Sequence, residues 1–174
     1  MEEVPISFLL SIFGGIELNL LSGNVLLSFL VILLLLVSSA FVSASEVAYF
    51  SLTLTELEEI NNDNVHQLLQ MPNQLLATIL IVNNFINVAI VVMSAYLTSI
   101  AILFPEGSSL EFFFQIVIIT SLLVLFGEIM PKVYANNNPV SFSIMMSKPL
   151  LILKKVVYPF SYLLVTTTNF IDKK

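Results

Sequence analysis

The sequence contains no cysteine and no arginine, and it has a single histidine, His66. Without cysteine, a disulfide, a thiolate metal site and a cysteine nucleophile are all excluded. One histidine argues against a histidine-based zinc site. The net charge is −6, so the chain lacks the basic face that binding to phosphate groups requires. Nucleic acid is therefore not an expected partner.

Charge of either sign is scarce: 10% of the 174 residues are charged, 57% are hydrophobic, and the mean hydropathy is +0.99. A soluble domain usually has about 45–50% apolar and ~25% charged residues. The chain has too little polar surface for an ordinary globular enzyme, and its apolar content excludes a disordered chain. It is predicted to be an integral membrane protein of one compact unit, and not an enzyme.

Three stretches are apolar and long enough to cross a bilayer as helices, at about 23–49, 75–103 and 110–135. The third is long enough only if its helix continues through Glu128 and Lys132. The predicted fold class is all-α integral membrane, with three transmembrane helices plus N-terminal and juxtamembrane interfacial helices. The N-terminal helix is expected around residues 6–13, because the acidic start of the chain is wrong for a signal peptide. The juxtamembrane helices are expected at about 54–71 and 139–172, with Thr53 or Thr55 as a helix cap in the first of them.

All six lysines lie between residues 132 and 174. Lysine accumulates on the cytoplasmic side of membranes, which predicts a cytoplasmic C-terminus and, with three spans, an outside N-terminus. Residues 139–172 are apolar but are interrupted by two prolines and by lysines. A fourth span would place those lysines in lipid, so short helices along the inner interface are favoured over a fourth span.

A cluster of small and polar residues follows the first apolar run, at residues 38–46. Ser43 and Glu46 are three residues apart and therefore share a helix face. Small residues also allow close helix packing. Helix packing and a functional site therefore explain the serines equally well. If the cluster is a functional site, Ser45 and Glu46 are expected to support its ligands.

Asn83, Asn84 and Asn87 lie deep in the second predicted span. Their spacings of three and four residues place the amides in one polar stripe on a helix. One amide can hold two helices together, but three within five residues exceed that need. The stripe therefore favours a functional site over helix packing.

The third polar cluster is Gly127-Glu128-Ile129-Met130-Pro131-Lys132. Pro131 has no N–H, and its ring clashes with the Gly127 carbonyl. The predicted kink frees carbonyl oxygens beside Glu128, which together suit a hard cation. Alternatively, Glu128 and Lys132 simply form a pair at i and i+4.

The three clusters together offer hydroxyl, amide carbonyl, carboxylate and backbone oxygens, and no soft ligand. Such sites suit Mg²⁺, Ca²⁺, Mn²⁺ or Na⁺ rather than zinc or copper. One carboxylate among neutral oxygens predicts moderate affinity, which a transport site needs because the ion must also leave. These residue types do not select the ion.

At these clusters the sequence resembles the transmembrane domain of the CorC and cyclin M family, the DUF21 domain. The matching segments are SASE with the following AYFSL at 43–52, VNNFINV at 82–88, and FGEIMPKVYA at 126–135. The resemblance implies that residues 1–174 are a homodimeric magnesium transporter domain, thought to carry out sodium-coupled efflux, in a bacterial inner membrane. It also implies cytosolic CBS domains in the full-length protein, which this sequence does not contain.

Matched motif by motif, the resemblance implies a dehydrated Mg²⁺ site made of Ser43, Asn84 or Asn87, the Gly127 region and Glu128. Supporting roles are expected for the other polar residues of the clusters. Pro131 would fix the kink, and Lys132 would either neutralise Glu128 or lie at the cytoplasmic entrance; the remaining supporting residues are Ser45, Glu46 and Asn83. The alternative function is a non-transporting membrane scaffold, for example one associated with gliding, in which the polar clusters only pack helices.

Overall fold

The structure is a computed structural model that describes residues 17–18, 22–103 and 113–172. It confirms an all-α integral membrane fold with three helical spans: Gly23–Phe50, Pro72–Ala101 and Gln115–Asn137. The N-terminal helix expected at residues 6–13 and the first residues of the third predicted span lie outside the described residues. A pair of two-residue strands, β1 (Glu17–Leu18) and β2 (Ile102–Leu103), joins the segment before the first span to the end of the second span in antiparallel register.

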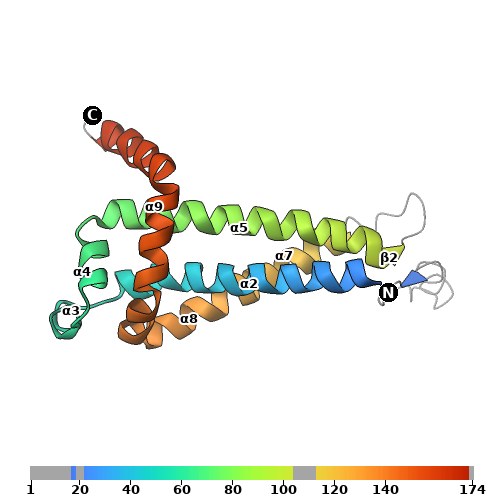
Figure 1. Cartoon of the computed structure of the whole chain (residues 1–174), viewed down its shortest axis with the longest axis horizontal. Coiled ribbons are helices and arrows are strands. Elements are labelled where there is room, and N and C mark those ends of the chain that lie inside the picture. The colour runs from blue at the N-terminus through green and yellow to red at the C-terminus, as the bar shows by residue number, and fades with distance from the viewer. Residues whose placement is uncertain (1–16, 19–21, 104–112, 173–174) are drawn as a thin grey trace, which may run out of the picture.

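The first two spans are single straight helices that lie side by side along most of their length (Figure 1). Helix α2 (Gly23–Phe50) is capped by Ser22, whose side chain accepts a hydrogen bond from the Val25 N–H. Helix α5 (Pro72–Ala101) has proline at its first position, where the missing N–H costs nothing. At 1.5 Å per residue, the 28 residues of α2 extend about 42 Å, more than the ~30 Å hydrocarbon core of a bilayer.

The third span is built differently, from η1 (Phe114–Ile119), α7 (Thr120–Leu122), η2 (Leu123–Ile129) and α8 (Met130–Asn137). Both η segments are π-helical, a conformation that is rare and frequent at functional sites. The irregular backbone expected near Pro131 therefore takes the form of π-helical turns. Pro131 is the second residue of α8, in the first turn, where a helix tolerates proline.

Two short helices connect α2 to α5 where one helical segment was expected at about 54–71. Helix α3 (Leu54–Glu59) begins with a capping box, in which Thr53 and Glu56 exchange hydrogen bonds. Thr53, rather than Thr55, is thus the cap. Helix α4 (Asp63–Leu69) is capped by Asn62, whose side chain accepts hydrogen bonds from two backbone N–H groups.

Residues 139–172 form one long helix, α9 (Pro139–Asp172), rather than several short ones. Pro149 and Pro159 lie inside it, and the helix changes direction along its course instead of ending (Figure 1). It runs across α2 and α5 rather than along them. In the part of the chain that the structure describes, α9 is not among the helices long and apolar enough to span a membrane.

The buried core lies at the α3–α4 end of the bundle, where α2, α4, α5, α8 and α9 meet. Tyr49 is buried there, and its hydroxyl donates a hydrogen bond of 2.8 Å to the backbone carbonyl of Ser143. Elsewhere the spans expose large apolar side chains, among them Leu26, Phe29 and Phe85. An apolar exterior over a partly polar interior is what a multi-pass membrane protein requires.

Candidate metal centre

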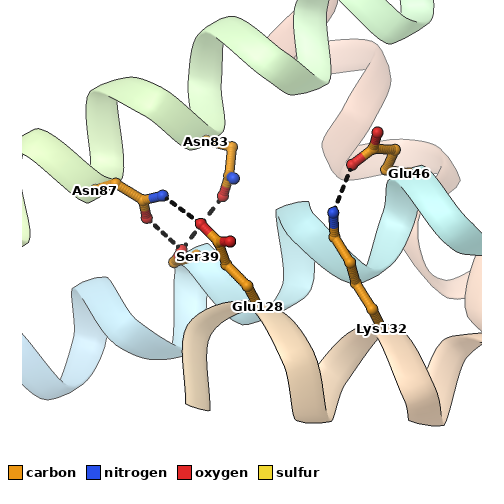
Figure 2. Close-up of polar contacts among 6 residues, drawn as sticks. All are labelled: Ser39, Glu46, Asn83, Asn87, Glu128 and Lys132. Carbon is orange, nitrogen blue, oxygen red and sulfur yellow. Dashed lines mark hydrogen bonds and ion pairs between the residues drawn. The ribbon is translucent and has the colours of Figure 1, made fainter. Parts of the chain in front are cut away.

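Three helical segments contribute to one polar network in the interior of the bundle. Figure 2 shows Ser39 from α2, Asn83 and Asn87 from α5, and Glu128 from η2 directed toward one another. The Ser39 hydroxyl donates to Oδ1 of Asn87 at 2.7 Å and approaches Oδ1 of Asn83 at 3.3 Å. The amide Nδ2 of Asn87 donates to Oε1 of Glu128 at 2.9 Å. Residues far apart in the sequence are thereby linked into a continuous chain of polar atoms.

Oxygen atoms predominate in this network. A serine hydroxyl has one hydrogen, so Ser39 shares it between two carbonyl oxygens, and the shorter contact to Asn87 takes the larger part. Asn87 uses both ends of its amide, one toward Ser39 and the other toward Glu128. Each hydrogen bond is thus made to an oxygen that could instead bind a hard cation.

Gly127 allows η2 to approach α2 closely. A Cβ atom at this position would lie 3.3 Å from Oγ of Ser39, closer than ordinary van der Waals contact. Since Glu128 is the next residue, this close approach also sets the distance of its carboxylate from α2. A side chain at position 127 would require Ser39 to shift by a few tenths of an ångström.

Ser43 lies one turn from Ser39 on the same side of α2. It is fully buried, and its hydroxyl oxygen has no hydrogen-bond partner in the described part of the chain. A buried polar atom without a partner costs about 1–3 kcal/mol, so its presence in a native fold calls for an explanation. Ser45, by contrast, donates to the Phe41 carbonyl of its own helix at 2.7 Å.

The amide stripe divides between two environments. Asn83 and Asn87 are half-buried and belong to the network, whereas Asn84 is exposed on α5. Within residues 22–103 and 113–172, Asn84 makes no hydrogen bond to the other members of the stripe. The three amides that helix spacing places in one stripe therefore do not share one site.

Lys132 pairs with Glu46, not with Glu128. Its Nζ lies 2.9 Å from Oε2 of Glu46 and joins α8 to α2, with the two side chains 36% and 30% exposed (Figure 2). The alternative pairing at i and i+4 is therefore wrong for this structure. Glu128 has Asn87 as its polar partner, and no cation among the described residues neutralises it.

Pro131 cannot donate a hydrogen bond to the carbonyl groups of the preceding helical turn. The Met130 N–H bonds to the Leu125 carbonyl, five residues earlier. In that π-helical register the next acceptor is the carbonyl of Phe126, and in an α-helical register it is the carbonyl of Gly127. Since Pro131 has no N–H, neither oxygen receives a bond from it.

The donor set is oxygen with a single carboxylate. In the described ranges, no group of three or more His, Cys, Asp or Glu side chains is placed to hold a metal ion. A cation here would depend on neutral oxygens and on Glu128. Ser39 belongs to the network, but the sequence analysis did not single it out from the serine cluster. It lies close to Gly127. Matching small residues on the two predicted spans could have indicated this close approach.

Residues 30–174 match the family model described as the cyclin M transmembrane N-terminal domain. This family is associated with Mg²⁺ transport in general and is a transporter or membrane module rather than a classical enzyme. No curated protein shows a significant match to the chain.

Proposed function

The chain belongs to the cyclin M transmembrane-domain family, and on this premise we propose that it transports Mg²⁺ through a dehydrated, oxygen-lined site in the bundle. The observation that carries the proposal is the convergence of Ser39, Asn87 and Glu128 from three helical segments inside an apolar protein. Polar groups at membrane depth are costly and mark ion pathways.

The proposed ligands are Ser43, Asn87, Glu128 and a carbonyl oxygen of the Gly127 region. Ser43 is included because its buried hydroxyl lacks a partner, which a cation would provide. Asn87 is preferred over Asn84, because Asn87 contacts Glu128 whereas Asn84 is exposed. Mg²⁺ releases water reluctantly, so these oxygens must be held ready to replace its hydration shell.

Hydrogen bonds hold the polar network in place. Oδ1 of Asn87 accepts from the Ser39 hydroxyl at 2.7 Å, and Nδ2 of Asn87 donates to Oε1 of Glu128 at 2.9 Å. In the proposed mechanism an entering cation replaces these hydrogens as the partner of the Asn87 and Glu128 oxygens, while Ser39 keeps the Asn87 side chain positioned.

In this proposal Lys132 and Glu46 are not ligands of the ion; their ion pair lies at the cytoplasmic entrance. Because Lys132 is engaged with Glu46, the charge of Glu128 stays available for a cation. Pro131 contributes through the backbone: because it has no N–H, the carbonyl groups of the preceding turn receive no hydrogen bond from it and can face an ion. Ser45 and Asn83 complete the surroundings of the ligands.

The finer features of transport remain part of the proposal. They are sodium-coupled efflux, a homodimer, a bacterial inner membrane with the N-terminus outside and the C-terminus in the cytoplasm, and CBS domains in the full-length protein. They rest on family membership and on the position of the lysines. A coupling Na⁺ ion is also a hard cation that oxygen ligands suit.

Calorimetry of the purified chain in detergent tests the site directly. Wild-type protein is expected to bind Mg²⁺, and Glu128→Gln is expected to abolish measurable binding because it removes the single charge. Asn87→Ala should weaken binding at least tenfold. Asn84→Ala is the matched control: it removes the same amide from an exposed position of the same helix, and its affinity should stay within about twofold of wild type.

Two results would contradict the proposal. One is wild-type protein that binds no Mg²⁺ while retaining its helical circular dichroism, which would favour the scaffold function. The other is a loss of binding in Asn84→Ala with normal binding in Asn87→Ala, which would move the site to the outer face of α5.

A further inference from the structure

A groove of about 780 Å³ lies on another side of the α2–α5 pair, where α9 crosses it. Its walls are almost entirely apolar and include Leu35 and Val42 from α2, Ile86 from α5 and Ile152 from α9. Lys148 is the charged residue among those that line it. The volume is in the range of about 300–1,000 Å³ that is typical of pockets for small molecules.

The polar group in the groove wall is already satisfied. Ser38 lines the groove, and its hydroxyl donates to the Leu34 carbonyl at 2.8 Å. The hydroxyl therefore does not need a partner from an occupant, and a hydrocarbon chain can lie against it without burying an unpaired donor. An apolar occupant fits the body of the groove for this reason.

The charged residues of α9 at and near the groove are positive. Lys148 is followed on α9 by Lys154 and Lys155, whereas the first acidic residue of this helix is Asp172. This local excess contrasts with the net charge of −6 for the whole chain. Lysine beside membrane spans attracts anionic lipid headgroups, and basic pockets between spans bind them.

We propose that the groove binds an anionic phospholipid, with an acyl chain against α2 and α5 and the phosphate group at Lys148. A lipid has both parts that the groove requires, a long apolar chain and an anionic end. Helix α9 lies across the spans rather than along them (Figure 1), as a helix in the headgroup region does. Lys148 on this helix is exposed, so a headgroup can reach it.

The lipid contacts the same helices that hold the polar network. Ser38 and Ile86 line the groove, and the residues that follow them, Ser39 and Asn87, belong to the network. The lipid site does not depend on Mg²⁺ transport, because its residues, its ligand and its test are separate. Failure of one proposal therefore leaves the other standing.

Fluorescence quenching provides the test, because the chain contains no tryptophan. Ile152→Trp places a single reporter at the edge of the groove, where the native side chain is 64% exposed and a larger ring is tolerated. The protein is reconstituted in vesicles that mix unlabelled lipid with brominated phosphatidylglycerol or brominated phosphatidylcholine. One lysine near a headgroup predicts about a fivefold preference for the anionic lipid at this reporter.

The matched control is Val156→Trp, one turn further along α9, at a side chain that is 69% exposed and outside the groove lining. Because Lys155 is its neighbour, this position can itself attract anionic lipid, so the comparison is the effect of Lys148→Gln, which should leave quenching at position 156 unchanged. Adding Lys148→Gln to the Ile152→Trp protein should remove the preference, whereas Lys148→Arg or Lys155→Gln should retain it. Circular dichroism confirms that each variant keeps its helices.

Several outcomes would overturn the proposal. Equal quenching by both lipids at position 152 would exclude a selective lipid site. Weak quenching by either lipid there, with strong quenching at position 156, would indicate that protein covers the groove. A preference that persists in Lys148→Gln and disappears in Lys155→Gln would show that Lys148 does not bind the headgroup.

Discussion

The ion pair between Lys132 and Glu46 leads to a quantitative prediction about how α8 is held against α2. Glu46→Gln and Lys132→Met, alone and together, form a double-mutant cycle. A hydrogen bond to a charged group contributes about 1.5–3 kcal/mol. Both side chains are about one-third exposed, so solvent reduces the interaction toward the value of surface pairs. We expect a coupling free energy of about 1 kcal/mol.

The assay is reversible unfolding in mixed micelles with increasing denaturing detergent, which gives a free energy of unfolding for each variant. The coupling should fall as salt rises from about 0.01 M to 1 M, because the screening length shortens from about 30 to 3 Å. The control cycle pairs Lys132→Met with Glu128→Gln and should show a coupling near zero. A larger coupling in the control cycle than in the Glu46 cycle would refute the assignment of Lys132 to Glu46.

Three further predictions concern packing and helix caps. Gly127→Ala should lower the free energy of unfolding by about 1–3 kcal/mol and weaken Mg²⁺ binding, because its Cβ meets Ser39 at 3.3 Å; unchanged stability in the same micelle titration would contradict this. Tyr49→Phe should cost about 1 kcal/mol, because it removes the buried hydroxyl that donates to the Ser143 carbonyl of α9; an unfolding midpoint equal to that of wild type would argue against the bond. Hydrogen bonds from Thr53, the cap of α3, lower the pKa of Glu56. The stability that the Glu56 carboxylate gives α3 is therefore present above the ordinary pKa of the group, and it is lost as pH falls through the lowered value. Amide exchange in α3 should accelerate in acid in the wild type and not in Glu56→Gln.

The fold was largely predictable from the sequence, because apolar runs near residues 23–49 and 75–103 allow few structures other than spanning helices. The capping position was also local information, although the sequence did not separate Thr53 from Thr55. The single long α9 was not predicted. Proline interrupts the hydrogen-bond ladder locally, but packing of α9 on α2, α4 and α5 lets the helix bend and continue.

The sequence identified the polar clusters that form the candidate site, but not which of their residues contact one another. Helix periodicity placed Asn83, Asn84 and Asn87 in a stripe, but it could not show which side of α5 packs against Glu128. The partner of Lys132 depended on the contact between α8 and α2, because the local i and i+4 rule favours Glu128. Such long-range choices are decided by how helices pack, which local spacing does not encode.

Magnesium flux from vesicles tests whether the chain transports Mg²⁺ through a site that depends on Glu128. The purified chain is reconstituted in vesicles loaded with Mg²⁺, and release is followed with and without an opposing sodium gradient. We expect wild-type release that the sodium gradient accelerates, no release above protein-free vesicles in Glu128→Gln, and near-normal release in Asn84→Ala. Equal release from wild-type and Glu128→Gln vesicles would show that the ion does not pass through this site.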